Sequence, residues 1–440
     1  MKITLKASIC MILAIIFLAL LPLACAVPES TQSPEKAAQL PSLEIWIFFD
    51  YNTPGTHYLD SWDELGEQFG YELNVKTFAT EELKDKLRIA LACSELPDIF
   101  AVWGGSFPEF LFDAQACLPV QDYIKNSGLN YADGYVSSYK DGNTYIIPCL
   151  VEAYAVTYCN TRLMEEMNLT LPSTWDELLD LVDTVNQYNA DHQTNYAAIG
   201  FGNKDSWLGE LLYAMIVNRE DPYALDKLIA GEIHFDDPDS AFLDAAEKID
   251  ILNEHQAFVD EFMQTGEVES VENFVNNSAV LLPHQSTIVY YLMEHMGEDG
   301  IKLIQFPDCS NGLYPDYSTY LMNANHNMTP GLCINQNTAY PEDAAKICLA
   351  FSQKVNEINV TEYGYLNYMD DASLTVPKRL PKAIQDFRLM VDQKQHQTSF
   401  WYATLPKDNA DTWQNLTKKL YARVLAPEEF VSQAAKCLVY

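Results

Sequence analysis

Short apolar runs and longer amphipathic stretches alternate along this chain from residue 43 onward. The mostly apolar run Leu43–Phe49 ends at Asp-Tyr-Asn-Thr-Pro-Gly, which is typical of a buried strand that enters a loop. The pattern that follows predicts a helix at 58–69, a strand at 72–78, a helix at 80–93 and a strand at 97–102. Strands that alternate with helices indicate a largely parallel sheet with helices on both faces.

The same alternation begins again after residue 150. Because a single hydrophobic core rarely grows beyond ~250–300 residues, two such patterns predict two domains. The stretch 379–412 has no clear period, so no elements are assigned to it. The predicted elements of the second half are a strand at 153–159, a helix that begins at Ser173-Thr-Trp-Asp-Glu with Ser173 as N-cap, a helix at 241–253 with Ser240 as N-cap, a strand at 279–282, and a helix opened by Pro341.

The first 26 residues have the layout of a secretory signal. Lys2 and Lys6 precede the apolar run Ile9–Ala24, which is marginal for a permanent span because a span needs about 20 apolar residues. Leu21-Pro-Leu-Ala-Cys25 resembles a lipobox, so Cys25 is the predicted lipidated first residue; Ala24-Cys25-Ala26 also fits an A-x-A cleavage site without lipid. Residues 26–42 are polar with three prolines and read as a flexible tether. The sequence therefore predicts an exported lipoprotein anchored in the cell membrane, on its extracellular or periplasmic side.

Charge and cysteine content exclude several functions. A formal net charge of −35 repels phosphate backbones, so a nucleic-acid partner is not expected. The cysteines form no C-x-x-C pair and no Cys/His cluster at zinc spacing, so we predict neither a metal site nor a cofactor. Export permits disulfides, but the apolar settings of the later cysteines favour buried free thiols. If a disulfide forms, Cys149 and Cys159 are the nearest pair in sequence.

Seven short segments together carry a resemblance to known proteins. In chain order they are Leu43-Glu-Ile-Trp-Ile, Ser94-Glu-Leu-Pro-Asp-Ile-Phe, Asp141-Gly-Asn-Thr-Tyr-Ile-Ile-Pro, Tyr158-Cys-Asn-Thr-Arg-Leu, Leu171-Pro-Ser-Thr-Trp-Asp-Glu-Leu, Ala339-Tyr-Pro-Glu-Asp-Ala-Ala-Lys and Pro427-Glu-Glu-Phe. Over about 390 residues they resemble, in order, the bacterial extracellular solute-binding proteins of family 1, which include maltose-binding protein and serve ABC importers.

This resemblance implies an α/β, periplasmic-binding-protein-like fold, in which two α/β lobes are joined by a multi-strand hinge with the ligand cleft between them. It implies crossovers near 148–153, 282–286 and 327–334, and a cleft at the carboxyl ends of strands, where open α/β sheets bind ligands. It also implies a monomer that closes around its solute and presents it to the permease subunits of an ABC importer. The expected division is a signal at 1–25, a tether at 26–42, lobe I at 43–150 plus about 285–330, and lobe II at 151–284 plus about 331–440.

Candidate ligand contacts in the first lobe follow from the family's cleft positions. Sugars offer apolar C–H faces and a rim of hydroxyls, which aromatic rings and carboxylates recognise. Asp50 and Tyr51 follow the first strand directly, although an ordinary turn explains them as well. Trp103 follows the strand Pro-Asp-Ile-Phe, where relatives place a cleft-wall aromatic. Glu152 and Tyr154 lie at the first crossover, where an acid between lobes contacts ligand or forms a hinge salt bridge.

The second lobe contributes the remaining candidates. Trp207 falls where relatives supply an aromatic side chain, and His284 and Ser286 lie at the second crossover, where sugar-binding relatives often have an aromatic that this chain lacks. His284 is also explained as a satisfied hinge residue. Trp401, in Phe-Trp-Tyr-Ala, matches a late cleft segment, while Trp413 competes for that role or packs its helix.

Three alternatives to sugar delivery remain open at this stage. The same fold could bind a polyamine, a peptide or another cationic solute, which the acidic composition favours. It could also load a membrane sensor in place of an importer. An extracellular glycosidase would need a carboxylate pair such as Asp50 and Glu152, but no nucleophile motif accompanies them. The sequence therefore predicts a binding protein without catalytic residues.

Overall fold

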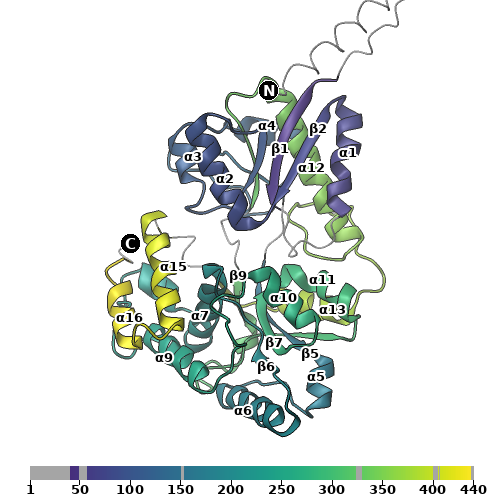
Figure 1. The fold of residues 1–440 in the computed structure, drawn as a ribbon. Helices are drawn as coiled ribbons and strands as arrows, with labels where there is room; N and C mark the ends of the chain where they lie inside the picture. Colours follow the sequence, from purple (N-terminus) through teal and green to yellow (C-terminus); the bar gives the residue numbers. More distant parts are fainter. Residues whose placement is uncertain are drawn as a thin grey trace, which may run out of the picture. The chain divides into compact units, whose positions relative to one another are not determined.

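The computed structural model describes residues 40–48, 57–149, 153–323, 330–399, 405 and 407–437, and residues 41–440 belong to one compact unit. Within the described ranges, three sheets organise this unit, and helices pack around the two larger ones (Figure 1). No helix among these residues combines the length and the apolar composition that crossing a bilayer requires. The predicted signal, the lipid-bearing Cys25 and residues 26–39 of the predicted tether lie outside the described residues. Ser42, expected as the last residue of the tether, is the first residue of β1.

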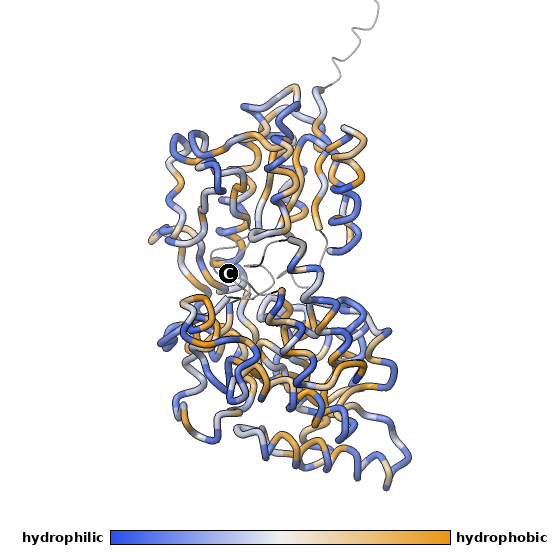
Figure 2. Tube along the Cα trace, turned by 90° about the vertical axis from the view of Figure 1, so that its left-hand side faces the viewer, coloured by the Kyte–Doolittle hydropathy of each residue, from blue (hydrophilic) through white to orange (hydrophobic). Residues whose placement is uncertain are grey.

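The first sheet has the strand order β2-β1-β3-β10-β4. β1 pairs in parallel with β2 and β3, and β10 runs antiparallel to β3 and β4. Buried strand residues and the inner faces of the helices form one hydrophobic core, and Figure 2 shows hydrophobic residues concentrated on these strands. The strands and helices of this lobe are β1 (Ser42–Phe48), α1 (His57–Phe69), β2 (Glu72–Phe78), α2 (Thr80–Cys93), β3 (Ile99–Val102), α3 (Glu109–Asp113), α4 (Gln121–Ser127), β4 (Ile147–Pro148), β10 (Gly331–Ile334) and α12 (Pro341–Thr361).

The second sheet has the order β6-β7-β5-β8, with β6 parallel to β7 and β5 antiparallel to both β7 and β8. α7 is buried on every side because it packs against β7, α9 and α15. The elements here are β5 (Ala155–Asn160), α5 (Thr161–Glu166), α6 (Trp175–His192), β6 (Ala197–Ile199), α7 (Ser206–Glu220), α8 (Ala224–Ile229), α9 (Ala241–Glu254), α10 (Glu267–Val275), β7 (Ala279–Gln285), η2 (Ser286–Ile288), α11 (Val289–Met296), β8 (Ile301–Ile304), α15 (Lys407–Tyr421) and α16 (Pro427–Ala434).

A small parallel sheet of β9 (Tyr320–Asn323) and β11 (His396–Ser399) lies beside the second sheet, and a bridge between Tyr154 and Asn323 connects the two. The short helix η3 (Tyr317–Thr319) leads into β9. α13 (Lys382–Asp392), α10 and α11 contribute to a hydrophobic core shared with β5, β7 and β8. The stretch 379–412, which has no sequence period, thus contains α13, β11 and the start of α15, which belong with the second lobe.

Strand pairing corrects the predicted allocation of two segments. Residues 285–330 were expected with the first lobe, but β8 pairs with β5 of the second sheet. Residues from 331 were expected with the second lobe, but β10 pairs with β3 and β4, and α12 packs against α1. The sequence pattern identifies strands without identifying their partners, because backbone pairing between distant segments leaves no local signature.

The crossovers change accordingly. The chain passes from the first sheet to the second between β4 and β5, returns between β9 and β10, and leaves again after α12. The expected crossover at 282–286 is wrong, because Leu281 and Leu282 pair with Cys159 and Tyr158 inside the second sheet and Gln285 is the last residue of β7.

Local signals placed most helix starts correctly. The Oγ of Ser240 accepts a hydrogen bond from the backbone N–H of Leu243 at 3.2 Å, as predicted for an N-cap, and Pro341 opens α12. The cap of α6 is Thr174 and not Ser173, because the hydroxyl of Thr174 and the carboxylate of Glu177 form a reciprocal capping box. The eight described cysteines are free thiols, and both Cys149 and Cys159 are buried.

Candidate functional site

The carboxyl edge of the first sheet presents a pair of aromatic rings. Phe48 is the last residue of β1, and Trp103 follows β3 directly. Because these strands are parallel, their carboxyl ends meet at one edge, and the two rings stack with centroids 4.6 Å apart at 27°. Phe107 extends the aromatic wall by meeting the Trp103 ring edge-on, at 5.6 Å and 81°. Trp103 therefore lies where open α/β sheets bind ligands.

Two of the chain segments that connect the lobes start or end at this same edge of the first sheet. Gly331 at the start of β10 is the register partner of both Val102 at the end of β3 and Pro148 at the end of β4. The chain segments that connect the two large sheets therefore begin next to Trp103. A ligand held by Trp103 would lie beside the connections that a change in lobe orientation must bend.

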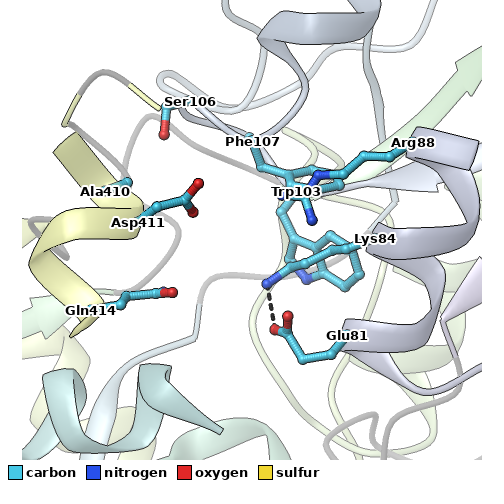
Figure 3. A pocket seen from close by; sticks show the side chains of 10 residues that line it. Glu81, Lys84, Arg88, Trp103, Ser106, Phe107, Ala410, Asp411 and Gln414 are labelled. Atoms are coloured by element: carbon cyan, nitrogen blue, oxygen red, sulfur yellow. Dashed lines mark hydrogen bonds and ion pairs between the residues drawn. The ribbon is translucent and has the colours of Figure 1, made fainter. Parts of the chain in front are cut away.

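A pocket of about 110 Å³ opens between this edge and α15 (Figure 3). This volume is below the ~300–1,000 Å³ of typical small-molecule sites. One wall comes from α2 and the segment after β3, and the opposite wall comes from α15. The lining residues are Glu81, Lys84, Arg88, Trp103, Gly104, Ser106, Phe107, Ala410, Asp411 and Gln414.

One face of α2 supplies the cations of the pocket. Glu81, Lys84 and Arg88 are spaced three and four residues apart, which places them on one side of the helix. The Nζ of Lys84 lies 2.7 Å from a carboxylate oxygen of Glu81 and 5.2 Å from the centroid of the Trp103 ring. The guanidinium of Arg88 lies 5.6 Å from the Phe107 ring centroid. The apolar wall of the pocket thus carries two basic groups along one rim.

The opposite wall is polar. Asp411 and Gln414, three residues apart on α15, point into the pocket from the side opposite Lys84 and Trp103 (Figure 3). Trp413, between them in sequence, faces the other way and is fully buried among Tyr213, Phe235 and Phe430. Trp413 is therefore a packing residue. A carboxylate and a carboxamide facing an aromatic wall can bind hydroxyl groups of a solute whose apolar side rests on the rings.

Comparison with protein families identifies the chain. The model described as "Bacterial extracellular solute-binding protein" matches residues 55–279, just over half of the chain. This chain belongs to that family. Comparison with curated protein sequences returned no match.

Solved structures of other solute-binding proteins have the same fold. A structure reported for xylan utilisation by Caldanaerobius polysaccharolyticus has a TM-score of 0.75 and 22% identity, covering 90% of this chain and 100% of that one. A solute-binding protein of Thermotoga lettingae bound to α-D-tagatose has a TM-score of 0.69 and 18% identity, covering 90% and 98%. A Bacillus licheniformis sugar transporter protein with stachyose has a TM-score of 0.62 and 15% identity, covering 90% and 98%. The α/β, periplasmic-binding-protein-like fold predicted from the sequence is confirmed.

Two of the predicted ligand contacts, Ser286 and Tyr154, are buried in this solute-binding protein. Ser286 is fully buried, and its Oγ accepts a hydrogen bond from the backbone N–H of Tyr154 and lies 2.6 Å from the hydroxyl of Tyr365. Tyr154 is fully buried too, and its hydroxyl accepts a hydrogen bond from Lys394. Both side chains join β5 to its neighbours, and in this conformation neither offers surface to a solute. This burial does not support the expectation that they contact ligand.

His284 is also a buried structural residue. It has no exposed surface, and burial lowers the pKa of its imidazole to about 3. The ring is therefore neutral; its Nδ1 accepts a hydrogen bond from the backbone N–H of Gln285, which leaves the proton on Nε2. Nε2 lies 3.6 Å from a carboxylate oxygen of Glu267, too far for a hydrogen bond, and a neutral ring forms no ion pair there. These contacts favour the structural role that the sequence also allowed for His284, and they do not support a ligand contact there.

Trp207, at the start of α7, has only 9% of its surface exposed and meets the His284 ring edge-on at 5.5 Å. It belongs to the core of the second lobe, which does not support the ligand contact proposed for it. Asp50, Tyr51, Glu152 and Trp401 lie outside the described residues. Of the predicted ligand contacts that the structure describes, Trp103 is therefore the one that lines the pocket.

The charged residues of the pocket were not among the ligand contacts predicted from the sequence. Lys84 and Arg88 recur at helical spacing beside the buried stripe of α2, so a search for polar residues on one helix face could have found them. Asp411 lies in the stretch without period and Gln414 just after it, and no sequence signal connects α15 to α2. Within the described part of the chain, no group of three or more metal-ligating side chains is gathered.

Proposed function

We propose that this solute-binding protein captures a carbohydrate, a mono- or oligosaccharide, in the pocket beside Trp103. The observation that carries the proposal is the pairing of an aromatic wall, Trp103 and Phe107, with a polar wall, Asp411 and Gln414. Sugar rings rest their C–H faces on aromatic rings and direct their hydroxyls toward carboxylates and amides. Structures with this fold that are reported with α-D-tagatose and stachyose support the same ligand class.

The charges of the pocket argue against the rival ligand class, a polyamine or another cationic solute. A binding site for a polycation gathers carboxylates, whereas this pocket has two cations, Lys84 and Arg88, against two carboxylates, Glu81 and Asp411. Glu81 is already engaged by Lys84. A neutral solute needs no net charge from its site.

We further propose that the protein is a monomeric lipoprotein, anchored through Cys25, that delivers its solute to the permease subunits of an ABC importer. Membership of the extracellular solute-binding family supports export and a small-molecule solute. The anchor rests on the lipobox-like Leu21-Pro-Leu-Ala-Cys25 and on the tether at 26–42. Cys25→Ala should release the protein into the medium, and a mature N-terminus at Val27 without lipid, found by mass spectrometry, would refute the anchor.

A thermal-shift screen tests the ligand class. Neutral mono- and oligosaccharides, spermidine and short peptides are each added to the purified protein, because a ligand that binds only the folded state raises Tm. We expect a rise with at least one saccharide and none with spermidine. A rise with spermidine or peptide alone would reject the carbohydrate proposal. Hits are then titrated by calorimetry, with Trp103→Ala as the site variant.

A further inference from the structure

The second lobe contains a larger hollow, of about 440 Å³, at the amino ends of β6 and β7. Its floor is formed by Ala197 and Ala279, the first residues of those two parallel strands. Its walls come from the end of α6, the segment after α9 and one side of α10. The volume falls within the ~300–1,000 Å³ of small-molecule sites.

This hollow is separate from the pocket beside Trp103. The connection from the first lobe enters the second sheet at Ala155, which is the register partner of Gln285 at the carboxyl end of β7. The carboxyl ends of β6 and β7 therefore face the connection to the first lobe, and their amino ends lie at the opposite edge of the sheet. A ligand in the hollow would not occupy the proposed solute site.

The walls of the hollow are held in place by carboxamides that bond to the backbone. Asn189 donates to the carbonyl of Tyr196 at 2.8 Å and accepts from its N–H at 2.9 Å, which ties α6 to the strand entrance. Asn186 donates to the carbonyl of His255 at 2.6 Å, which ties the same helix to the segment after α9. The cavity is therefore preformed, because its opposing walls are bonded to each other at two points.

A second set of polar groups has no bonding role. The side chains of Gln256, Asn273 and Ser278 line the hollow, and none of them forms a hydrogen bond within the described part of the chain. They come from three different segments: the segment after α9, α10, and the turn into β7. Two carboxamides and a hydroxyl, each able to donate and accept, are thus available to a ligand.

Charge and apolar surface narrow the ligand class. Asp260 is the one charged residue of the lining, and its carboxylate accepts a hydrogen bond from Asn195 at 3.2 Å. With no basic side chain in the lining and a chain charge of −35, an anionic ligand is repelled. The rings of Tyr196 and Phe258 supply apolar surface. The lining thus combines hydrogen-bond donors and acceptors with aromatic rings and has no positive charge. Such a surface suits a neutral molecule that carries several hydroxyl groups.

We propose that this hollow is a second binding site, independent of the solute pocket, for a neutral saccharide unit, with Gln256, Asn273 and Ser278 as its hydroxyl contacts. Occupation of this site would let the protein hold a longer glycan, or a neighbouring one, while the solute pocket carries its own ligand. The inference does not depend on the ligand of the solute pocket.

The test measures saccharide binding by ligand-observed saturation-transfer NMR in the Trp103→Ala protein, where the solute pocket is impaired. The probes are D-galactose, maltotetraose and xylotetraose, with D-galacturonate as the anionic comparison. Adding Gln256→Ala and Asn273→Ala together should weaken neutral-sugar binding at least tenfold. Asn276→Ala, an exposed neighbour outside the lining, is the matched control and should change nothing.

Tm of the double variant should equal that of its parent, because neither side chain bonds to the protein. Galacturonate should bind at least tenfold more weakly than galactose. The proposal is overturned if the Gln256/Asn273 variant binds neutral sugars as well as its parent, if no probe binds the Trp103→Ala protein, or if galacturonate binds as tightly as galactose. Failure of the proposed function would give a different result: the Trp103→Ala protein would bind saccharides as tightly as the wild type does.

Discussion

The ring of Trp103 stacks on Phe48 on one side of the solute pocket, with centroids 4.6 Å apart, and the ammonium of Lys84 lies 5.2 Å from the centroid of the same indole. The indole is thus held by the end of a neighbouring strand and approached by a cation from α2. Its orientation is set before ligand arrives, which lowers the entropic cost of binding.

Trp103→Ala should weaken sugar binding by roughly 1–3 kcal/mol, about 5- to 150-fold, because the ligand loses an aromatic face. Calorimetric titration of the best saccharide hit gives the measurement. Trp46→Ala is the matched control: it removes another partly buried indole of the same lobe, which pairs with Phe78 and is absent from the pocket lining. Equal losses in both variants would mean that Trp103 acts through stability alone.

The charge of the ligand can be tested from the protein side. Replacing Lys84 and Arg88 together by Gln removes both cations from the pocket rim. For a neutral sugar we expect the affinity to stay unchanged or to weaken, and to depend little on salt concentration. The reason is that a neutral ligand forms no ion pair with the protein for salt to screen. Tighter binding of spermidine by this variant than of any sugar would favour the cationic-solute alternative.

Gly331→Ala should destabilise the protein by about 1–3 kcal/mol, the usual cost of overpacking a filled site. A Cβ on Gly331 would lie 2.2 Å from the carbonyl oxygen of Ile147 and 2.8 Å from its carbon, and backbone atoms there cannot move without disturbing the β4–β10 pairing. Urea unfolding gives the measurement. An unchanged midpoint would show that the strand pairing relaxes without cost.

His284 should make the free energy of unfolding depend on pH. Burial lowers its pKa to about 3 in the folded protein, against about 6.5 in the unfolded chain. Between these values the unfolded state binds a proton that the folded state does not, so stability falls as the pH drops below about 6.5. At pH 5 the loss relative to pH 7 is about 2 kcal/mol from this residue.

His284→Asn should remove that part of the pH dependence, since the amide oxygen can accept the Gln285 N–H in place of Nδ1. Urea unfolding at pH 5 and pH 7 measures the difference. His295→Asn, which replaces an exposed histidine, is the matched control. Identical slopes in wild type and the His284 variant would contradict the buried neutral imidazole.

Ligand binding should close the two lobes. The connections between β4 and β5, between β9 and β10, and after α12 would absorb the backbone change, and Pro148 restricts bending to its neighbours. The closed form must bind ligand more tightly than the open one, since equal affinity shifts nothing. Small-angle scattering at saturating ligand should give a smaller radius of gyration. An unchanged radius would argue for a rigid receptor and against the delivery model.

Local sequence signals determined much of this protein. Alternating apolar runs located the strands around β1, β2, β3, β5 and β7, since each strand face must bury its own side chains. Ser240 marked a helix start because an N-cap bonds to a backbone N–H only three residues away, and Pro341 marked another because its fixed φ and missing N–H suit the first helical position. Trp103 could be singled out from its position after a buried strand, and short ordered segments sufficed to identify the family.

Only the tertiary structure decided which segments share a sheet and which side chains are exposed. Nothing local in the sequence distinguishes β10, which joins the first lobe, from β8, which joins the second. Tyr154, His284 and Ser286 looked like cleft residues from their place beside an expected crossover, yet each is fully buried. Asp411 and Lys84 are more than three hundred residues apart and line one pocket. Burial and convergence of this kind depend on contacts between distant segments, which arise when the lobes assemble and which a local pattern does not encode.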